Sequence, residues 1–166
     1  MVKQLAMPID NLERMIQLAQ DFFNTKDDPN QISVNKRTIS RLRKIHHSTM
    51  SERANKNGPI AWVLVIPTTH KLMEKFIAKE ISEQQLLQKT PLRAQYDALY
   101  LCSALVLPEH RGKGLAKRLL AQAVRSIQKQ HLVKYLFFWA FSIEGERLAT
   151  SVAKKLSLPL LQREAD

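Results

Sequence analysis

The residues with the clearest chemistry are Arg111-Gly112-Lys113-Gly114, a turn with two glycines between an apolar run and a helical pattern. The apolar run, Ala98 to Leu107, has the composition of a buried strand, and Pro108 ends it because proline has no backbone N–H. After the turn, apolar residues recur at helical spacing from Leu115 to Ile127. Such a turn leaves the first N–H groups of the helix unpaired at the positive end of its dipole. The segment therefore predicts a binding site for an anion such as phosphate, and glycine lets that anion approach the backbone.

Two familiar phosphate-binding patterns, G-x-x-x-x-G-K-[ST] and G-x-G-x-x-G, do not occur in the sequence. The pattern that does occur is V-x-P-x-x-R-G-x-G-x-A, from Val106 to Ala116. It resembles the acyl-CoA-binding signature of the GNAT superfamily of N-acetyltransferases, written [QR]-x-x-G-x-[GA], which Arg111, Gly114 and Ala116 satisfy. The alternative is a strand-to-helix connection that uses glycine only to turn.

The resemblance implies acetyl-CoA as the acyl donor. It implies that the backbone of the turn holds the pyrophosphate, and that two parallel strands splay apart so that the pantetheine arm fits between them. The first of these strands would bind that arm through its backbone. The residues expected to bind the donor are Leu105, Val106, Leu107, Arg111, Gly112, Lys113, Gly114, Leu115 and Ala116.

The resemblance also implies transfer of the acetyl group to a primary amine. An alkyl amine with a pKa of about 10.4 must lose a proton before it attacks, so a general base is expected. Many family members place a glutamate on the strand before the glycine turn, where this sequence has only Asp97, near the strand's start. Asp97 would face away from Cys102 unless a bulge shifts the register. Glu144, in the loop after the second parallel strand, is the other candidate for the general base.

Two further positions bear on catalysis. Family members often carry a tyrosine on the last helix that protonates the leaving thiolate, and Ala153 occupies the matching position here. This difference leaves an alternative open, a CoA-binding protein without catalysis that acts as a sensor or interaction module. Cys102 lies beside the expected thioester, but no sequence neighbour would lower its thiol pKa, so we interpret it as a small core residue.

The composition limits the class of protein. A chain of 166 residues with 45% hydrophobic content predicts a single domain, residues 1–166. A single cysteine excludes an intrachain disulfide and favours the cytoplasm. No apolar run is long enough to span a membrane, and Met1 to Asn11 does not have the pattern of a signal peptide. The five histidines lack metal-ligand spacing, so no metal is expected.

The net charge of +11, from 26 Lys and Arg against 15 Asp and Glu, attracts anions in general. The cations are spread along the chain without interleaved aromatic residues, so we do not expect nucleic acid as a partner, although a basic nucleic-acid-binding protein without CoA is a third alternative. The expected partners are acetyl-CoA and an amine acceptor. The oligomeric state stays open, with a homodimer among the options.

The expected fold is α/β, with a central mixed sheet of about five or six strands flanked by helices. The apolar run Tyr135 to Phe141 shows no alternation, which is typical of a parallel strand buried on both faces. With the strand and helix before it, this run forms a right-handed crossover unit. A helical insertion at about residues 69–92, absent from the common family pattern, is expected either to shape the acceptor pocket or only to extend the core. The other expected elements are helices at Leu12–Phe23 after the N-cap Asp10, at Asn35–His47 and at Glu146–Leu156, a loop at Asn24–Asn30, a turn at Asn55–Pro59, and strands at Ile60–Ile66 and Leu158–Leu161. His46 and His47 are interpreted as helix-terminal cations or partly packed side chains.

Overall fold

The sheet has five strands in the order β1-β2-β3-β4-β5. The computed structural model describes residues 10–25, 32, 35–140 and 142–165. The first three strands are antiparallel neighbours, and β3, β4 and β5 run parallel to one another. The predicted α/β fold with a mixed sheet is confirmed. The strands are β1 (Met50–Asn55), β2 (Gly58–Thr68), β3 (Ala98–Val106), β4 (Tyr135–Trp139) and β5 (Leu160–Arg163).

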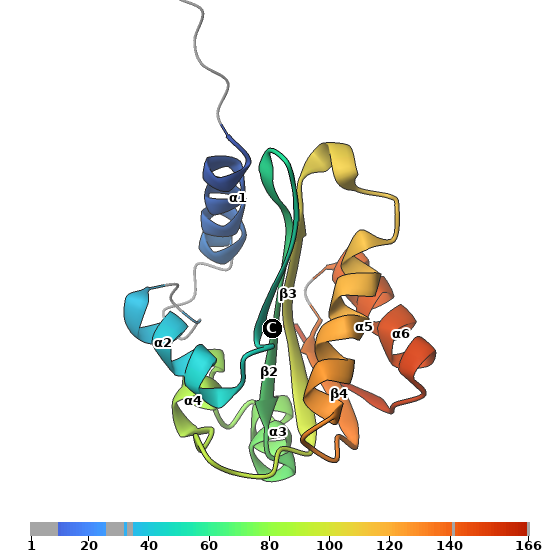
Figure 1. Ribbon diagram of the computed structural model, residues 1–166. Helices are drawn as coiled ribbons and strands as arrows, with labels where there is room; N and C mark the ends of the chain where they lie inside the picture. Colours follow the sequence, from blue (N-terminus) through green and yellow to red (C-terminus); the bar gives the residue numbers. More distant parts are fainter. Residues whose placement is uncertain (1–9, 26–31, 33–34, 141, 166) are drawn as a thin grey trace, which may run out of the picture.

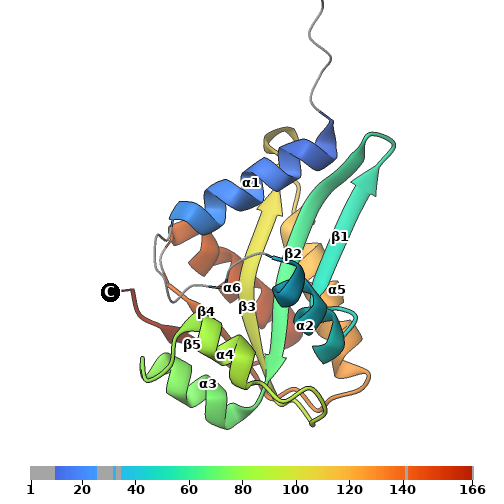
Figure 2. The ribbon, with the colours of Figure 1, turned by 90° about the vertical axis from the view of Figure 1, so that its left-hand side faces the viewer.

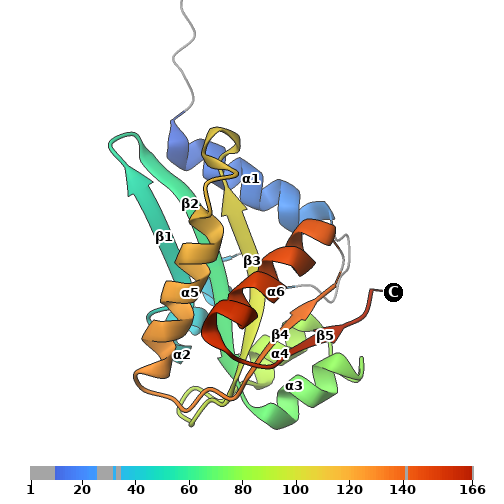
Figure 3. The same cartoon turned by 90° about the vertical axis from the view of Figure 1, so that its right-hand side faces the viewer.

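Helices cover both faces of the sheet. Figures 1 and 2 show α1 to α4 on one face, and Figure 3 shows α5 and α6 on the other. Successive side chains of β3 point to opposite faces of the sheet. Leu99 and Leu101 pack beneath α5 and α6, while Tyr100 and Cys102 pack beneath the helices of the opposite face. The helices are α1 (Asn11–Thr25), α2 (Lys36–Ile45), α3 (His70–Ile77), α4 (Glu83–Lys89), α5 (Leu115–Gln128) and α6 (Ile143–Leu156), with a short 3-10 helix η1 (Pro108–His110).

The parallel strands β3 and β4 separate partway along their length. They pair only where 98–100 lies beside 135–137. Beyond this point β3 continues in register with β2, and β4 continues with β5. The result is a gap in the sheet between the second half of β3 and the end of β4.

A β-bulge lies on β3 where the gap begins. Leu64 of β2 is opposite Ser103, whereas the next residue, Val65, is opposite Leu101. Cys102 is therefore the extra residue of the bulge. Since the bulge reverses the alternation, Ala104 and Val106 contact the α5 side, as Leu99 and Leu101 do.

The inserted segment is helical, as predicted, but it forms two helices instead of one. The first, α3, ends at Ile77, and Lys79 then adopts a left-handed conformation with φ 63°. The second, α4, starts at a capping box in which the Ser82 hydroxyl accepts from Gln85 N–H while the Gln85 side chain accepts from Ser82 N–H. This local capping interrupts the apolar periodicity that suggested one helix.

Several boundaries differ from the expected ones. Strand β1 was not predicted, because its sequence MSERAN is polar and it is an edge strand paired only with β2. Helix α6 starts at Ile143, earlier than expected, since the Ser142 hydroxyl accepts from Gly145 N–H and caps it. Strand β4 ends at Trp139, and Phe141 lies outside the described residues, as does most of the loop expected at 24–30.

The N-terminal helix α1 lies across β2 and β3 (Figure 2). The Asp10 carboxylate accepts from Glu13 N–H at 2.8 Å, which confirms the predicted cap. Met15 is fully buried against Leu105 and Leu107. No helix in the described part of the chain is long and apolar enough to cross a membrane.

His46 is a packed residue and not a helix-terminal cation. Its Nδ1 accepts from Ser48 N–H at 2.9 Å and its Nε2 lies 2.6 Å from Gln130 Oε1, an arrangement that the neutral Nε2–H tautomer satisfies. Burial lowers its pKa below the usual value of 6.5. Burial also lowers the pKa of His131, whose Nδ1 accepts from Tyr96 N–H.

Candidate functional site

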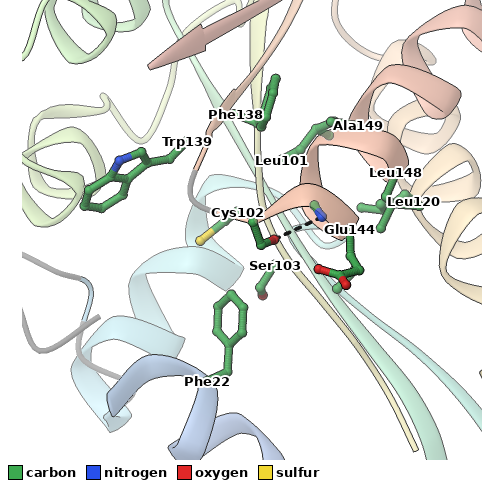
Figure 4. A pocket seen from close by; sticks show the side chains of 13 residues that line it. Phe22, Leu101, Cys102, Ser103, Leu120, Phe138, Trp139, Glu144, Leu148 and Ala149 are labelled. Carbon is green, nitrogen blue, oxygen red and sulfur yellow. Dashed lines mark hydrogen bonds between the residues drawn. The ribbon is translucent and has the colours of Figure 1, made fainter. Parts of the chain in front are cut away.

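A cavity of about 240 Å³ occupies the gap between β3 and β4 (Figure 4). Two groups of side chains line it. One side is formed by Leu120 of α5 with Leu148 and Ala149 of α6, and the other by Phe22 of α1, Cys102 of β3 and Trp139 of β4. The remaining lining residues are Leu101, Ser103, Ala104, Phe138, Ser142, Glu144 and Gly145.

The glycine turn lies between η1, which follows β3, and the start of α5. Gly112 and Gly114 have φ values of 77° and 74°, in the left-handed region that favours glycine. Gly114 is the N-cap of α5 and, as a glycine, has no side chain with which to cap the helix. The first N–H groups of α5 have no intrahelical partners, so they point toward an external acceptor. The turn thus has the geometry of an anion site, formed by the residues predicted for it.

Two arginines are held at the turn by backbone carbonyls. Arg111 Nε donates to Val106 O at 2.9 Å, and Arg118 Nη1 donates to Lys113 O at 2.9 Å. The sequence analysis did not identify Arg118 as a residue of the anion site. Its spacing of four residues from Gly114 could have indicated it, because residues four apart share one helix face. Together the two guanidinium groups add positive charge beside the exposed N–H groups.

The backbone N–H and C=O groups of β3 point alternately toward β2 and toward the gap. Leu107 N–H donates to Ile60 O at 3.0 Å and so faces β2. Because antiparallel residues alternate in direction, Leu105 also faces β2, while Ala104 and Val106 face the gap. Of the three backbone positions predicted to bind the pantetheine arm, Val106 is thus the one that faces the gap, and its carbonyl oxygen is already bonded to Arg111 Nε.

The two predicted acids lie in different places. Asp97 precedes β3, outside the described pocket lining, and its Oδ1 accepts from His70 N–H at 2.7 Å, at the start of α3. The bulge at Cys102 comes five residues later in the chain and leaves Asp97 where it is. Glu144 lies in the exposed first turn of α6 and lines the pocket on the α6 side (Figure 4). The structure therefore brings Glu144 to the pocket and keeps Asp97 at the far end of the strand.

Ala153 and Cys102 are both buried, on opposite faces of the sheet. Ala153 is 5% exposed and packs in the core between α6 and the sheet, where a tyrosine side chain has no room. Cys102 is 6% exposed and belongs to the apolar cluster of the opposite face, as its interpretation as a core residue requires. It nevertheless forms part of the pocket wall.

The aromatic residues of the pocket wall were not predicted as site residues. Trp139 belongs to the apolar run 135–141, which was interpreted as a buried strand, although the carboxyl end of a parallel strand is where open sheets bind ligands. Phe22 comes from a helix far away in the sequence, and its helical spacing indicated only a buried face. Among the described residues, no group of three or more His, Cys, Asp or Glu side chains is arranged to hold a metal ion.

The splayed strands and the glycine turn agree with the comparison with protein families. The family model described as Acetyltransferase (GNAT) family matches residues 12–153. A comparison with curated proteins finds no match. The matched range spans the sheet from before β1 to β4, the glycine turn and most of α6. The chain therefore belongs to the GNAT acetyltransferase family.

Proposed function

We propose that this protein transfers the acetyl group of acetyl-CoA to a primary amine. Family membership indicates acyl-CoA-dependent acetyl transfer in general. The observation that carries the finer proposal is that α5, which begins at the glycine turn, contributes Leu120 to the wall of the pocket that opens where β3 leaves β4. A donor bound along this path would have its phosphates at the turn and its thioester at the bulge.

The residues at the turn fit the phosphates of this donor. The N–H groups of Leu115 and Ala116 start α5 and point outward, and the left-handed glycines leave the backbone open to close approach. At Gly112 an added Cβ would meet no described atom within 4 Å, so the loop surface is accessible. Arg111 and Arg118 supply charge that is already held in position.

Within the gap, backbone groups do the remaining binding. The N–H of Val106 and the N–H and C=O groups of Ala104 face the gap and would bind the pantetheine arm, whereas Val106 O already accepts from Arg111. A backbone N–H near the bulge would polarise the thioester carbonyl. When bound, the donor supplies an activated acetyl group. The chain holds the amine close to that group, and no covalent enzyme intermediate is required.

We assign the side of the pocket formed by Phe22, Cys102 and Trp139 to the acceptor and call it the acceptor half. It favours an amine with an apolar body. Phe22 and Trp139 offer aromatic surface, which also attracts cations. Glu144 stands on the opposite side of the pocket as an exposed carboxylate. Glu144 and Asp97 stay predictions as general bases, and of the two Glu144 is the one within reach of a bound ligand.

Calorimetric titration tests the proposal first. We expect one-to-one binding of acetyl-CoA and of CoA that survives moderate salt, whereas nonspecific attraction to a chain of charge +11 would vanish with added salt. A panel of amines with acetyl-CoA then tests transfer, with free CoA thiol as the readout. Binding without transfer would instead favour the alternative, a sensor or interaction module without catalysis.

A further inference from the structure

Glu83, the first residue of α4, is a carboxylate buried in the core directly behind the pocket. It is 1% exposed. Its Oε2 accepts from the Tyr100 hydroxyl at 2.5 Å and from the Cys102 thiol at 3.9 Å. Its Oε1 accepts from Ile32 N–H at 3.2 Å. The inserted helix thus carries an acid to the bulge of β3.

These contacts suit the ionised form of Glu83. All three groups donate, and an ionised carboxylate only accepts. Burial and the charge of Glu83 both raise the pKa of Tyr100 well above its usual value, so Tyr100 keeps the proton that it donates. A buried charge requires such partners, since an unpaired one would be costly.

The charged and titratable groups facing Glu83 come from two strands. Tyr100 and Cys102 belong to β3. Arg163 of β5 is 8% exposed, and its Nη1 donates to Ile81 O at 2.7 Å, two residues before Glu83 in the chain. The positive charge of Arg163 acts on Tyr100 in the direction opposite to that of Glu83. Arg163 thus acts on the hydroxyl group that Glu83 binds, and the Cys102 thiol lies on the side of the pocket.

The Cys102 thiol is the link between Glu83 and a bound ligand. Cys102 lines the acceptor half beside Phe22 and Trp139, on the sheet face covered by α1 to α4. Glu144 lies across the pocket on α6, as Figure 4 shows. A cationic amine in the acceptor half would thus meet a thiol whose proton already points to a carboxylate.

We propose that Glu83 receives the proton of the acceptor amine through the Cys102 thiol. This rests on the proposed function. One N–H bond of the ammonium breaks and its proton passes to Sγ, while the original thiol proton passes to Glu83 Oε2. The neutral nitrogen then forms a bond to the thioester carbonyl carbon, the carbon–sulfur bond to CoA breaks, and the second nitrogen proton leaves with the CoA sulfur. Glu83 afterwards releases its proton to water, which restores the carboxylate.

Glu83→Gln tests this step with two acceptors. One is an alkyl amine, which is protonated at neutral pH, and the other an aromatic amine that is already neutral. We expect kcat/KM for the alkyl amine to fall about 100-fold, the size of a general-base contribution, with little change for the aromatic amine. A purely structural role would lower both values equally. The loss for the alkyl amine should also shrink as the pH rises, because the free amine then becomes available without a base.

Substitutions of Cys102 keep the test decisive if Glu83→Gln folds poorly. Cys102→Ala removes the relay and should reproduce the selective loss, while Cys102→Ser retains a hydroxyl and should restore part of the rate. Glu144→Gln tests the competing candidate for the general base, on the other side of the pocket. Titration of each variant with acetyl-CoA reports whether the donor site is intact.

Three results would overturn the inference. The first is an equal loss for both amines in Glu83→Gln, and the second is an unchanged rate with the alkyl amine in Cys102→Ala. The third is a selective loss in Glu144→Gln alone. Each would show that the amine proton does not pass through Cys102 to Glu83. The absence of turnover by the unsubstituted protein with any amine would instead overturn the proposed function, and the inference with it.

Discussion

Replacing Gly114 by alanine tests whether the backbone of the glycine turn binds the phosphates of the donor. Gly114 has φ 74° and is the N-cap of α5. A Cβ added there would lie 3.1 Å from Arg118 Nη1, the end of a flexible side chain. The methyl group would therefore displace the guanidinium and stand between the N–H groups of α5 and an approaching anion.

The expected effect on stability is small. A left-handed conformation costs an L-residue about 1–2 kcal/mol, and the stiffer unfolded chain of the variant offsets about 0.4–1 kcal/mol of this. The net loss of about 1 kcal/mol is minor against a typical unfolding free energy of about 5–15 kcal/mol. If the methyl group removes one hydrogen bond between a backbone N–H and a phosphate, binding should weaken by about 1.5–3 kcal/mol, since the acceptor is charged. The Kd of acetyl-CoA should thus rise about ten- to a hundredfold in a protein that stays folded.

Calorimetry with acetyl-CoA, paired with a thermal melt, separates these effects. Gly58→Ala is the matched control, since Gly58 has φ 112° and is the first residue of β2, directly after the turn from β1. An added Cβ there would be 3.3 Å from Asn11 Cβ. It should lower Tm without changing the Kd of acetyl-CoA. If Gly114→Ala lowers Tm as the control does and still binds acetyl-CoA with unchanged affinity, the backbone of the turn does not hold the phosphates.

Three further predictions concern the rest of the molecule. The pKa of His46 is lower in the folded protein than in the unfolded chain, so on acidification the unfolded chain binds the proton at a higher pH. Protonation therefore favours unfolding, and the free energy of unfolding should fall as the pH falls below about 6.5. Urea unfolding on either side of it should show this loss, and His46→Gln should reduce the pH dependence. The Arg14 guanidinium, bonded to both oxygens of Glu109 at 2.6 and 2.7 Å, lowers the pKa of that carboxyl to about 2. In Arg14→Ala an NMR titration should find this pKa near its ordinary value of about 4.3, and an unchanged value would mean that the ion pair is not its cause. Ala153→Tyr should destabilise the protein by about 1–3 kcal/mol through overpacking and should not accelerate acetyl transfer, so a faster variant of unchanged Tm would contradict the packing seen around Ala153.

The sequence by itself determined the segment from β3 through the glycine turn to α5. The order of strand, glycine turn and helix, the positions of Gly112 and Gly114, and the family are all encoded in one continuous segment. Local rules suffice there, because positive φ angles, the missing cap and the apolar spacing of α5 depend on neighbours in the chain. The parallel strand Tyr135–Trp139 was predictable for the same reason, as a run of apolar residues.

The tertiary structure alone decided the wall of the pocket formed by Phe22, Cys102 and Trp139. Nothing near Cys102 in sequence indicates the bulge, which arises from the register between β2 and β3. No sequence pattern singles out Glu83, which α4 places against Tyr100 and Cys102, 17 and 19 residues away. Asp97 likewise proved to be bonded at the start of α3. These contacts join separate elements whose distance and register follow from packing of the whole core, and a local pattern carries no information about them.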